Sequence, residues 1–258
     1  MTRRLSLEGV DNFRDYGDYR TASGRRLKAR RLYRSASHGR ATDADLAKIH
    51  DLEIAVIVDL RRATEQARDP SRRHHAFTGT VITSATAAAE EDGWIKHMQS
   101  SDLTESAFRD YMVTYYREAP FDPRHVDLFR RYFEALAASN GPILIHCAAG
   151  KDRTGILAAL THHLAGVHPD DAMTDYLLTN DPDRIERRLQ VVTETIAGFS
   201  GKTPSEAAVR VAMAVEPHYL ATAFGEIEGR HGGLDAYMTD MLGVDAARRR
   251  DIEDRILE

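Results

Sequence analysis

The sequence has little of the residue that most often marks a reactive or cross-linked protein: its 258 residues contain one cysteine, Cys147. A single cysteine excludes an intramolecular disulfide and a cysteine-rich metal site. A lone thiol is most often a small buried hydrophobic residue. A chemical role for Cys147 therefore has to be supported by the residues around it.

Long apolar stretches and long basic runs are also missing. No segment reaches the length of a membrane span, and the two arginines near the N-terminus are not followed by the apolar region of a secretory signal. The formal net charge of −5, without a basic run, disfavours a nucleic-acid partner. We therefore expect a cytoplasmic protein with no integral membrane association and no nucleic-acid partner.

Strand patterns are concentrated in the first third of the chain. Residues 16–35 contain a turn-like TASG segment between two polar-apolar stretches, which predicts a hairpin. Residues 42–45 (TDAD) have the pattern of a capping box that opens a helix ending near Asp51. Residues 54–60 (IAVIVDL) form a continuous run rich in β-branched residues, which is typical of a strand covered on both faces.

Helix and strand patterns alternate through the middle of the chain. Apolar residues at helical spacing predict a buried helix face over residues 108–116. Residues 122–123 (DP) supply an N-cap and a first-turn proline for the next helix, which ends at residues 140–141 (NG). Residues 142–146 (PILIH) predict a second short buried strand, and residues 156–166 predict another helix.

From about residue 169 onward the pattern is helical, and Asp245 opens the last helix with Ile252 and Ile256 facing inward. Strands mixed with helices, followed by helices alone, predict an α/β fold: a central, mostly parallel sheet flanked by helices, with a helical C-terminal half. With 42% hydrophobic residues the chain can bury a substantial core, so we expect one domain over residues 1–258. Whether the late helices form a lid or cover the sheet is left open.

The segment with a chemical signature is HCAAGKDRTG, residues 146–155, between a predicted strand and a predicted helix. Successive backbone N–H groups at such a junction can converge on an anion, and the helix dipole adds partial positive charge. Cys147, at the head of this loop and near Arg153, is expected to be held as the reactive thiolate. The nucleophile is then activated without an adjacent base.

The other residues of the loop suit the binding of a phosphoryl group. The planar guanidinium of Arg153 matches two phosphate oxygens, which a lysine cannot do. Gly150 permits a turn with positive φ, and the hydroxyl of Thr154 is placed to donate to the cysteine sulfur. The predicted substrate-binding residues are Ala148, Ala149, Gly150, Lys151 and Thr154.

This Cys-x₅-Arg loop resembles that of the protein-tyrosine phosphatase superfamily, and the whole string resembles bacterial phosphatases related to mycobacterial tyrosine phosphatase B. Three further blocks are similar to that family: residues 12–15 (NFRD), residues 31–35 (RLYRS), and residues 59–61 (DLR) with Glu65. The resemblance implies hydrolysis of phosphotyrosine, and also of phosphoserine or phosphothreonine, in proteins or small phosphomonoesters. It implies a cysteinyl-phosphate intermediate, no metal and no organic cofactor.

By the same resemblance Cys147 is the nucleophile and Arg153 binds the phosphate. The Trp-Pro-Asp loop that carries the acid in other tyrosine phosphatases is absent from the sequence. Asp152 is therefore the first candidate for the proton donor, and Asp59, at the end of a buried strand, is the second. We expect Lys151 to attract the anionic substrate.

Several alternatives remain at this stage. A phosphoinositide phosphatase could use the same loop, but lipid-directed relatives often carry a basic residue where this chain has Ala148. A non-catalytic phospho-binding module usually lacks the cysteine or the arginine. Sulfur or arsenate chemistry is disfavoured because no second thiol could resolve an intermediate.

Other motifs are expected to be structural. Residues 74–75 and 162–163 are histidine pairs without ligand spacing. The arginines of residues 61–73 could form a basic rim for acidic substrates, but a plain solvated surface is favoured. His146 neighbours Cys147 on a strand end, where adjacent side chains point to opposite faces. This disfavours a catalytic cysteine–histidine pair, so we expect His146 to brace the loop. The NFRD block of residues 12–15 is also expected to have a structural role.

Overall fold

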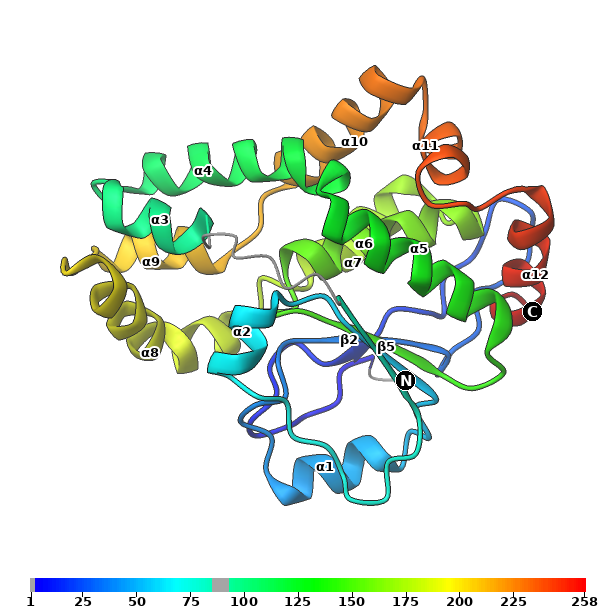
Figure 1. The fold of residues 1–258 in the computed structure, drawn as a ribbon, viewed down its shortest axis with the longest axis horizontal. Helices are drawn as coiled ribbons and strands as arrows, with labels where there is room; N and C mark the ends of the chain where they lie inside the picture. Colours follow the sequence, from blue (N-terminus) through cyan, green and yellow to red (C-terminus); the bar gives the residue numbers. More distant parts are fainter. Residues whose placement is uncertain (1–2, 85–92) are drawn as a thin grey trace.

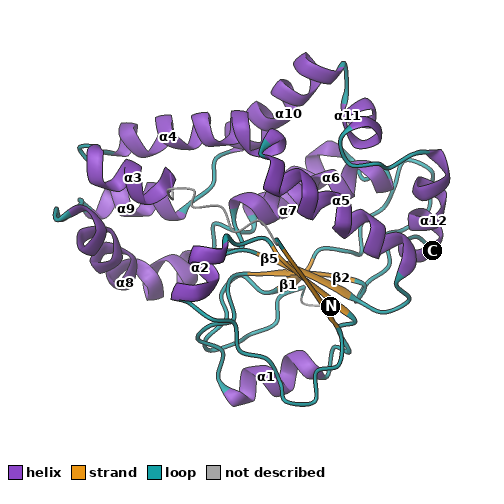
Figure 2. Ribbon diagram, in the orientation of Figure 1, coloured by secondary structure: helices purple, strands orange, loops and turns teal. Residues whose placement is uncertain are grey.

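Five short strands form one sheet in the order β1-β2-β5-β3-β4 in the computed structural model, which describes residues 3–84 and 93–258 (Figure 2). Strand β1 is antiparallel to β2, and the other neighbours are parallel. The strands are β1 (Arg14–Asp15), β2 (Leu32–Ser35), β3 (Val56–Asp59), β4 (Thr80–Thr83) and β5 (Ile143–His146). The expected α/β fold with a mostly parallel sheet is confirmed.

Helices cover both faces of this sheet and continue to the C-terminus (Figure 1). The helices that precede the loop of residues 147–151 are α1 (Asp43–His50), α2 (Ala63–Arg68), α3 (Gly93–Ser100), α4 (Glu105–Glu118), the 3₁₀ turn η1 (Ala119–Phe121) and α5 (Pro123–Ala138). Those that follow are α6 (Asp152–Ala165), α7 (Pro169–Leu177), α8 (Pro182–Ser200), α9 (Glu206–Met213), α10 (Pro217–His231), α11 (Leu234–Asp240) and α12 (Ala246–Ile256).

The central strand β5 shows why the sheet is covered on both faces. Ile143 and Ile145 belong to the large core shared with α5 and α6, whereas Leu144 packs in the smaller core with Leu46 and Ile49 of α1. Successive side chains of a strand point to opposite faces, so a strand apolar at every position needs a layer on each side. The continuous apolar runs in the sequence therefore reflect two cores.

The late helices divide between two positions. Helices α6, α7 and α10–α12 extend the layer above the sheet, whereas α8 and α9 pack with α3 and α4 in a separate lobe (Figure 1). Met98, Phe108, Ile196 and Val209 form the apolar core of this lobe. The helical C-terminal half therefore both covers the sheet and contributes a lobe beside it.

Most predicted helix ends are confirmed by their capping residues. Thr42 and Asp45 form the capping box of α1, and the carboxylate of Asp122 accepts hydrogen bonds from the first N–H groups of α5. Gly166 ends α6 with a φ of 74°, and Asp245 caps α12. Helices α2 and α3 and strand β4 were not predicted; they are among the shorter elements of the fold.

A buried ion cluster fastens the antiparallel edge of the sheet to α7. Arg14 and Arg34 face each other across the β1–β2 ladder, and both bind Asp175, at 3.3 Å (Nε–Oδ1) and 2.9 Å (Nη1–Oδ2). Burial alone would raise the pKa of Asp175, but the two guanidinium groups hold it well below its ordinary value. One carboxylate thus binds both buried arginines, and the cluster keeps one net positive charge.

Replacing this carboxylate by an amide, Asp175→Asn, should lower the free energy of unfolding by about 3–5 kcal/mol, because two arginines are left buried without a counter-ion. Because the folded-state pKa of Asp175 is depressed, its contribution is complete above the unfolded carboxyl pKa of about 4 and is lost as the pH falls through the folded value. Urea unfolding at several pH values measures both effects. Asp171→Asn, an exposed position of the same helix, is the control and should change stability by less than about 0.5 kcal/mol. Equal stability of the two variants would contradict the cluster's role.

Candidate active site

The loop of residues 147–151 joins the carboxyl end of β5 to the N-terminus of α6. Ligands of open parallel sheets bind at this edge. Cys147 is 2% exposed and lines a cavity of about 470 Å³. The cavity is also lined by predicted site residues Ala148, Ala149, Lys151, Asp152 and Arg153. Gly150 and Thr154 are buried in the same segment.

Gly150 is required by the path of the loop. Its φ is 64°, and a Cβ at this position would lie 2.5 Å from the backbone carbon and oxygen of Ser35. Its carbonyl oxygen accepts hydrogen bonds from Asn12 Nδ2 at 2.7 Å and Arg34 Nη2 at 3.1 Å. Asn12, whose block could either hold the first strand or touch the active site, with structure favoured, therefore holds the turn of the loop.

The guanidinium of Arg153 is held in one orientation by Glu65 of α2. Its two Nη atoms donate to the two carboxylate oxygens of Glu65 at 2.6 and 2.7 Å, and Nη1 also donates to the carbonyl of Leu60 at 3.1 Å. Burial would raise the pKa of Glu65, but Arg153 lowers it to about 2. The pKa of Arg153 is raised by the same partner, against the effect of burial. Both groups therefore stay ionised at neutral pH.

The carboxyl group of Asp152 lies at the cavity and is held by a chain of two tyrosines. Tyr116 donates its hydroxyl to Asp152 Oδ1 at 2.9 Å, and its oxygen is 2.7 Å from the hydroxyl of Tyr176. Lys151 Nζ lies 3.7 Å from the same Oδ1. This role of Tyr116 could not be predicted from the sequence, because its helix has the apolar pattern of an ordinary core helix and the contact joins residues 36 positions apart.

Asp59 occupies a different environment. Its carboxylate is buried and forms two hydrogen bonds with Arg61, at 2.9 and 2.7 Å, and His146 Nε2 is 3.7 Å away. Despite burial, which would raise it, the pKa of Asp59 is lowered by His146 and Arg61. This carboxylate is therefore ionised and is bound by Arg61 at the end of β3. Arg61 is correspondingly buried, where a solvated surface was expected.

The side chain of Lys151 binds backbone rather than the open cavity. Its ammonium donates to the carbonyl oxygens of Ala212 at 2.6 Å and Ala214 at 3.2 Å, at the carboxyl end of α9. Arg184 of α8 donates to the carbonyl of Met213 at 2.9 Å. Lys151 therefore joins the loop to the α8–α9 lobe, a contact that the sequence does not indicate.

The expected hydrogen bond from Thr154 to Cys147 is not formed. The Thr154 hydroxyl is buried and has no hydrogen-bond partner among residues 3–84 and 93–258. His146, on the opposite side of the strand end from the cavity, stacks on His38 with ring centroids 5.1 Å apart. Its placement agrees with a brace for the loop.

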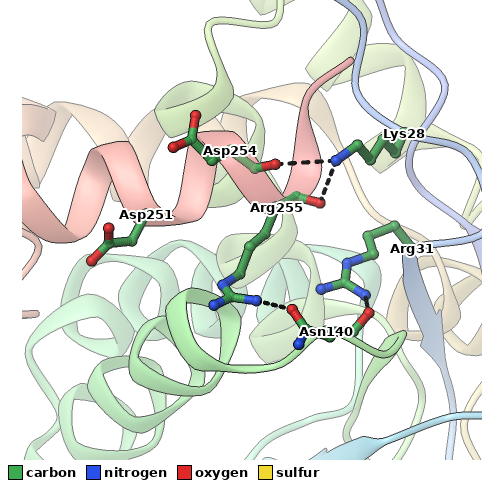
Figure 3. A pocket seen from close by; sticks show the side chains of 6 residues that line it. All are labelled: Lys28, Arg31, Asn140, Asp251, Asp254 and Arg255. Atoms are coloured by element: carbon green, nitrogen blue, oxygen red, sulfur yellow. Dashed lines mark hydrogen bonds between the residues drawn. The ribbon is translucent and has the colours of Figure 1, made fainter.

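A second hollow, of about 510 Å³, lies at the ends of α5 and α12, away from the loop (Figure 3). Its basic side chains are engaged with backbone: Lys28 donates to the carbonyls of Asp254 and Arg255, and Arg31 to that of Asn140. Cations in these positions satisfy the last carbonyls of a helix. These hydrogen bonds join the ends of α5 and α12 to residues 28–31, so we interpret the hollow as structural.

We also searched for membrane-spanning helices and for metal-binding groups. Within residues 3–84 and 93–258, no helix is long and apolar enough to cross a membrane. The same ranges contain no group of three or more His, Cys, Asp or Glu side chains that could hold a metal ion.

The two histidines of residues 162–163 have separate partners. His162 is buried, with Nε2 2.7 Å from the carbonyl oxygen of Tyr16, and His163 Nε2 is 3.0 Å from Asp235 Oδ1.

A cysteine-headed loop that joins the carboxyl end of a parallel strand to a helix N-terminus forms an anion-binding site. Comparison with known proteins agrees. Residues 5–258 match the model of a tyrosine phosphatase family, and the chain belongs to this family. The enzyme is thus a tyrosine phosphatase.

The relatives span most of the chain. A triple specificity protein phosphatase of Mycobacterium tuberculosis is 30% identical over 274 residues, covering 91% of this chain and 92% of the relative. A Cupriavidus necator protein named as a tyrosine-protein phosphatase is 29% identical over 249 residues, covering 95% and 86%. A tyrosine-protein phosphatase of Nostoc commune is 32% identical over 156 residues, covering 59% and 49%.

The Arg153–Glu65 pair can be tested with an isosteric variant. Glu65→Gln should weaken orthovanadate binding by about tenfold or more, because the guanidinium loses one of two charge-assisted hydrogen bonds that orient it. Isothermal titration at neutral pH measures the dissociation constant. Glu228→Gln, on exposed α10 surface, should bind vanadate as the wild type does. Unchanged affinity in Glu65→Gln would show that Arg153 does not depend on Glu65.

Proposed function

We propose that this tyrosine phosphatase transfers the phosphoryl group of its substrate to Cys147 Sγ and then to water. The observation that carries the proposal is the pairing of a buried cysteine with Arg153, fixed by Glu65, at the N-terminus of α6. Arg153, the loop N–H groups and the helix dipole would stabilise the negative charge on the transferring phosphoryl oxygens.

In the first step the Cys147 thiolate attacks phosphorus, the P–O bond to the leaving group breaks, and the leaving oxygen takes a proton from Asp152. In the second step water attacks the phosphorus of the cysteinyl phosphate. Asp152 accepts a proton from that water, and the thiolate leaves with the S–P electron pair. The phosphoryl oxygens would be bound by the loop residues Ala148, Ala149, Gly150, Lys151 and Thr154. Lys151 would contribute its backbone N–H, because its ammonium binds α9.

We assign the acid to Asp152 rather than Asp59 because of their surroundings. Asp152 lines the cavity, whereas both oxygens of Asp59 are occupied by Arg61. Since Tyr116 occupies Oδ1 of Asp152, Oδ2 is the oxygen that would carry the transferred proton. Tyr116 is then a positioning residue.

The proposed substrate is phosphotyrosine in proteins. Aromatic side chains of the cavity, Trp94, Tyr111 and Tyr115, suit a phenyl ring beside the phosphate-binding loop. The Mycobacterium tuberculosis relative is named for triple specificity, so the proposal extends to phosphoserine and phosphothreonine. A reactive free thiol needs reducing conditions to persist, which favours the cytoplasm as the site of action.

The nucleophile assignment predicts that Cys147→Ser abolishes turnover while oxyanion binding remains. A serine hydroxyl is hardly ionised at neutral pH and cannot replace the thiolate. Phosphate release from p-nitrophenyl phosphate measures turnover, and titration with tungstate measures binding. Activity within about tenfold of the wild type would overturn the assignment.

The acid assignment predicts a dependence on the leaving group. Asp152→Asn should slow phosphotyrosine by about 10²–10⁴-fold and an activated aryl phosphate much less, because only the poorer leaving group needs the proton. Tyr116→Phe should show the same graded pattern to a smaller extent. A purely structural role would lower all rates equally.

The measurement is kcat across aryl phosphates of graded leaving-group pKa, with Asp59→Asn as the comparison. Asp59→Asn should give a deficit that is the same for every ester. A flat deficit for Asp152→Asn with a graded one for Asp59→Asn would transfer the acid role to Asp59.

A further inference from the structure

The catalytic cavity is strongly basic in a chain that is acidic overall. Among the described residues that line it, nine are Arg or Lys and four are Asp or Glu, an excess of five positive charges. The whole chain has a formal net charge of −5. Asp59, behind the lining, pairs with Arg61 at 2.7 Å, so four positive charges remain in excess, against the two negative charges of a phosphomonoester.

The four carboxylates of the cavity account for only some of the cations. Their ion pairs are Glu65 with Arg153, Asp152 with Lys151, Asp69 with Arg61, and Asp11 with Arg40 and Arg188. Two further arginines, Arg124 and Arg184, are each only 6% exposed. Buried cations of this kind are costly unless an anion compensates them.

Arg124 is the one beside the phosphate-binding arginine. Its Nη1 donates to the carbonyl of Leu60 at 2.9 Å, the same oxygen that accepts from Arg153 Nη1 at 3.1 Å. The two guanidinium groups are therefore neighbours. Burial, followed by the charge of Arg153, lowers the pKa of Arg124.

The other contacts of Arg124 are mainly with neutral groups. His125 Nδ1 lies 2.8 Å from the carbonyl of Ala119 and must donate to it, which leaves Nε2 to accept from Arg124 Nη2 at 2.6 Å. The nearby carboxylate on the same helix end is that of Asp122: its Oδ1 caps α5, and its Oδ2 lies 3.9 Å from Arg124 Nη2, beyond hydrogen-bond distance. Arg124 Nε has no hydrogen-bond partner among residues 3–84 and 93–258.

From this arrangement we propose that Arg124 forms a second anion subsite, which binds a phosphate or carboxylate adjacent to the scissile phosphotyrosine in a peptide substrate. The inference rests on the proposed function. It adds that the enzyme selects phosphotyrosine flanked by a second phosphorylated or acidic residue. A peptide is favoured over a lipid headgroup because the same cavity carries the aromatic side chains Tyr111 and Tyr115, which suit phenyl rings rather than a polyol.

The test compares three peptides of one sequence, in which the phosphotyrosine is flanked by alanine, by glutamate or by a second phosphotyrosine. Wild type should show a kcat/KM about tenfold or more higher for the two acidic peptides, since a charge-assisted hydrogen bond to a desolvated cation is gained. Arg124→Met should lose this preference and keep kcat/KM for the alanine peptide within about threefold. Arg130→Met, at an exposed position of the same helix α5, should keep the preference.

Three outcomes would overturn the subsite: no preference in the wild type, an equal loss on all three peptides in Arg124→Met, or a preference that survives in that variant. A soluble inositol bisphosphate that is a better substrate than both acidic peptides would overturn the choice of a peptide. If Arg124→Met does not fold, Arg124→Lys replaces it. A lysine cannot reproduce the planar fork, so most of the preference should still be lost.

Binding separates this inference from the proposed function. In the Cys147→Ser background the dissociation constants of the same peptides report the subsite without turnover. Tighter binding of the acidic peptides that disappears with Arg124→Met supports the subsite even if no peptide is hydrolysed, a result that would contradict only the proposed function. Equal dissociation constants for the three peptides would contradict the subsite while hydrolysis still supported the function.

Discussion

The ion pair between Arg153 and Glu65 is the constraint on which the rest of the site depends. It ties the first turn of α6 to α2, two elements that approach the sheet edge from separate parts of the chain. An arginine with free rotamers would lose conformational entropy each time a phosphate bound. Here the fold has already fixed the guanidinium, so under the proposed function a phosphate would meet a preorganised donor. The carbonyl oxygen of Leu60 accepts a hydrogen bond from Arg153 and another from Arg124. The position of Arg153 is therefore linked to that of Arg124 in the cavity wall.

Around this pair the structure repeatedly uses one device, a buried carboxylate that holds arginines. Asp175 joins β1, β2 and α7 through Arg14 and Arg34, and Asp59 fixes Arg61 at the end of β3. Such clusters contribute little net stability compared with a well-packed apolar core, but they fix geometry because breaking one leaves an uncompensated charge. Their result is a loop whose turn at Gly150 is held from two sides. The positive field of the site is thus built from groups that cannot easily rearrange.

The sequence predicted local features well and long-range ones poorly. The loop of residues 146–155 could be identified because its chemistry is contained in ten consecutive residues, and the caps at Thr42 and Asp122 because a cap is a local hydrogen bond. The direction of Lys151 toward α9 and the hold of Tyr116 on Asp152 depend on residues far away in the chain. No periodicity encodes such contacts. The elements α2, α3 and β4 escaped for another reason: with six, eight and four residues, they are too short for a periodic pattern to identify them.

The contact between Lys151 and α9 also bears on how this protein can change in evolution. The lysine is bound by carbonyl oxygens of Ala212 and Ala214, groups that every amino acid carries. The exposed side chains of α9 can therefore diverge among related proteins without loss of the contact, whereas the lysine has no backbone substitute. This contact therefore constrains the residue at position 151 and leaves the side chains at positions 212 and 214 free to vary.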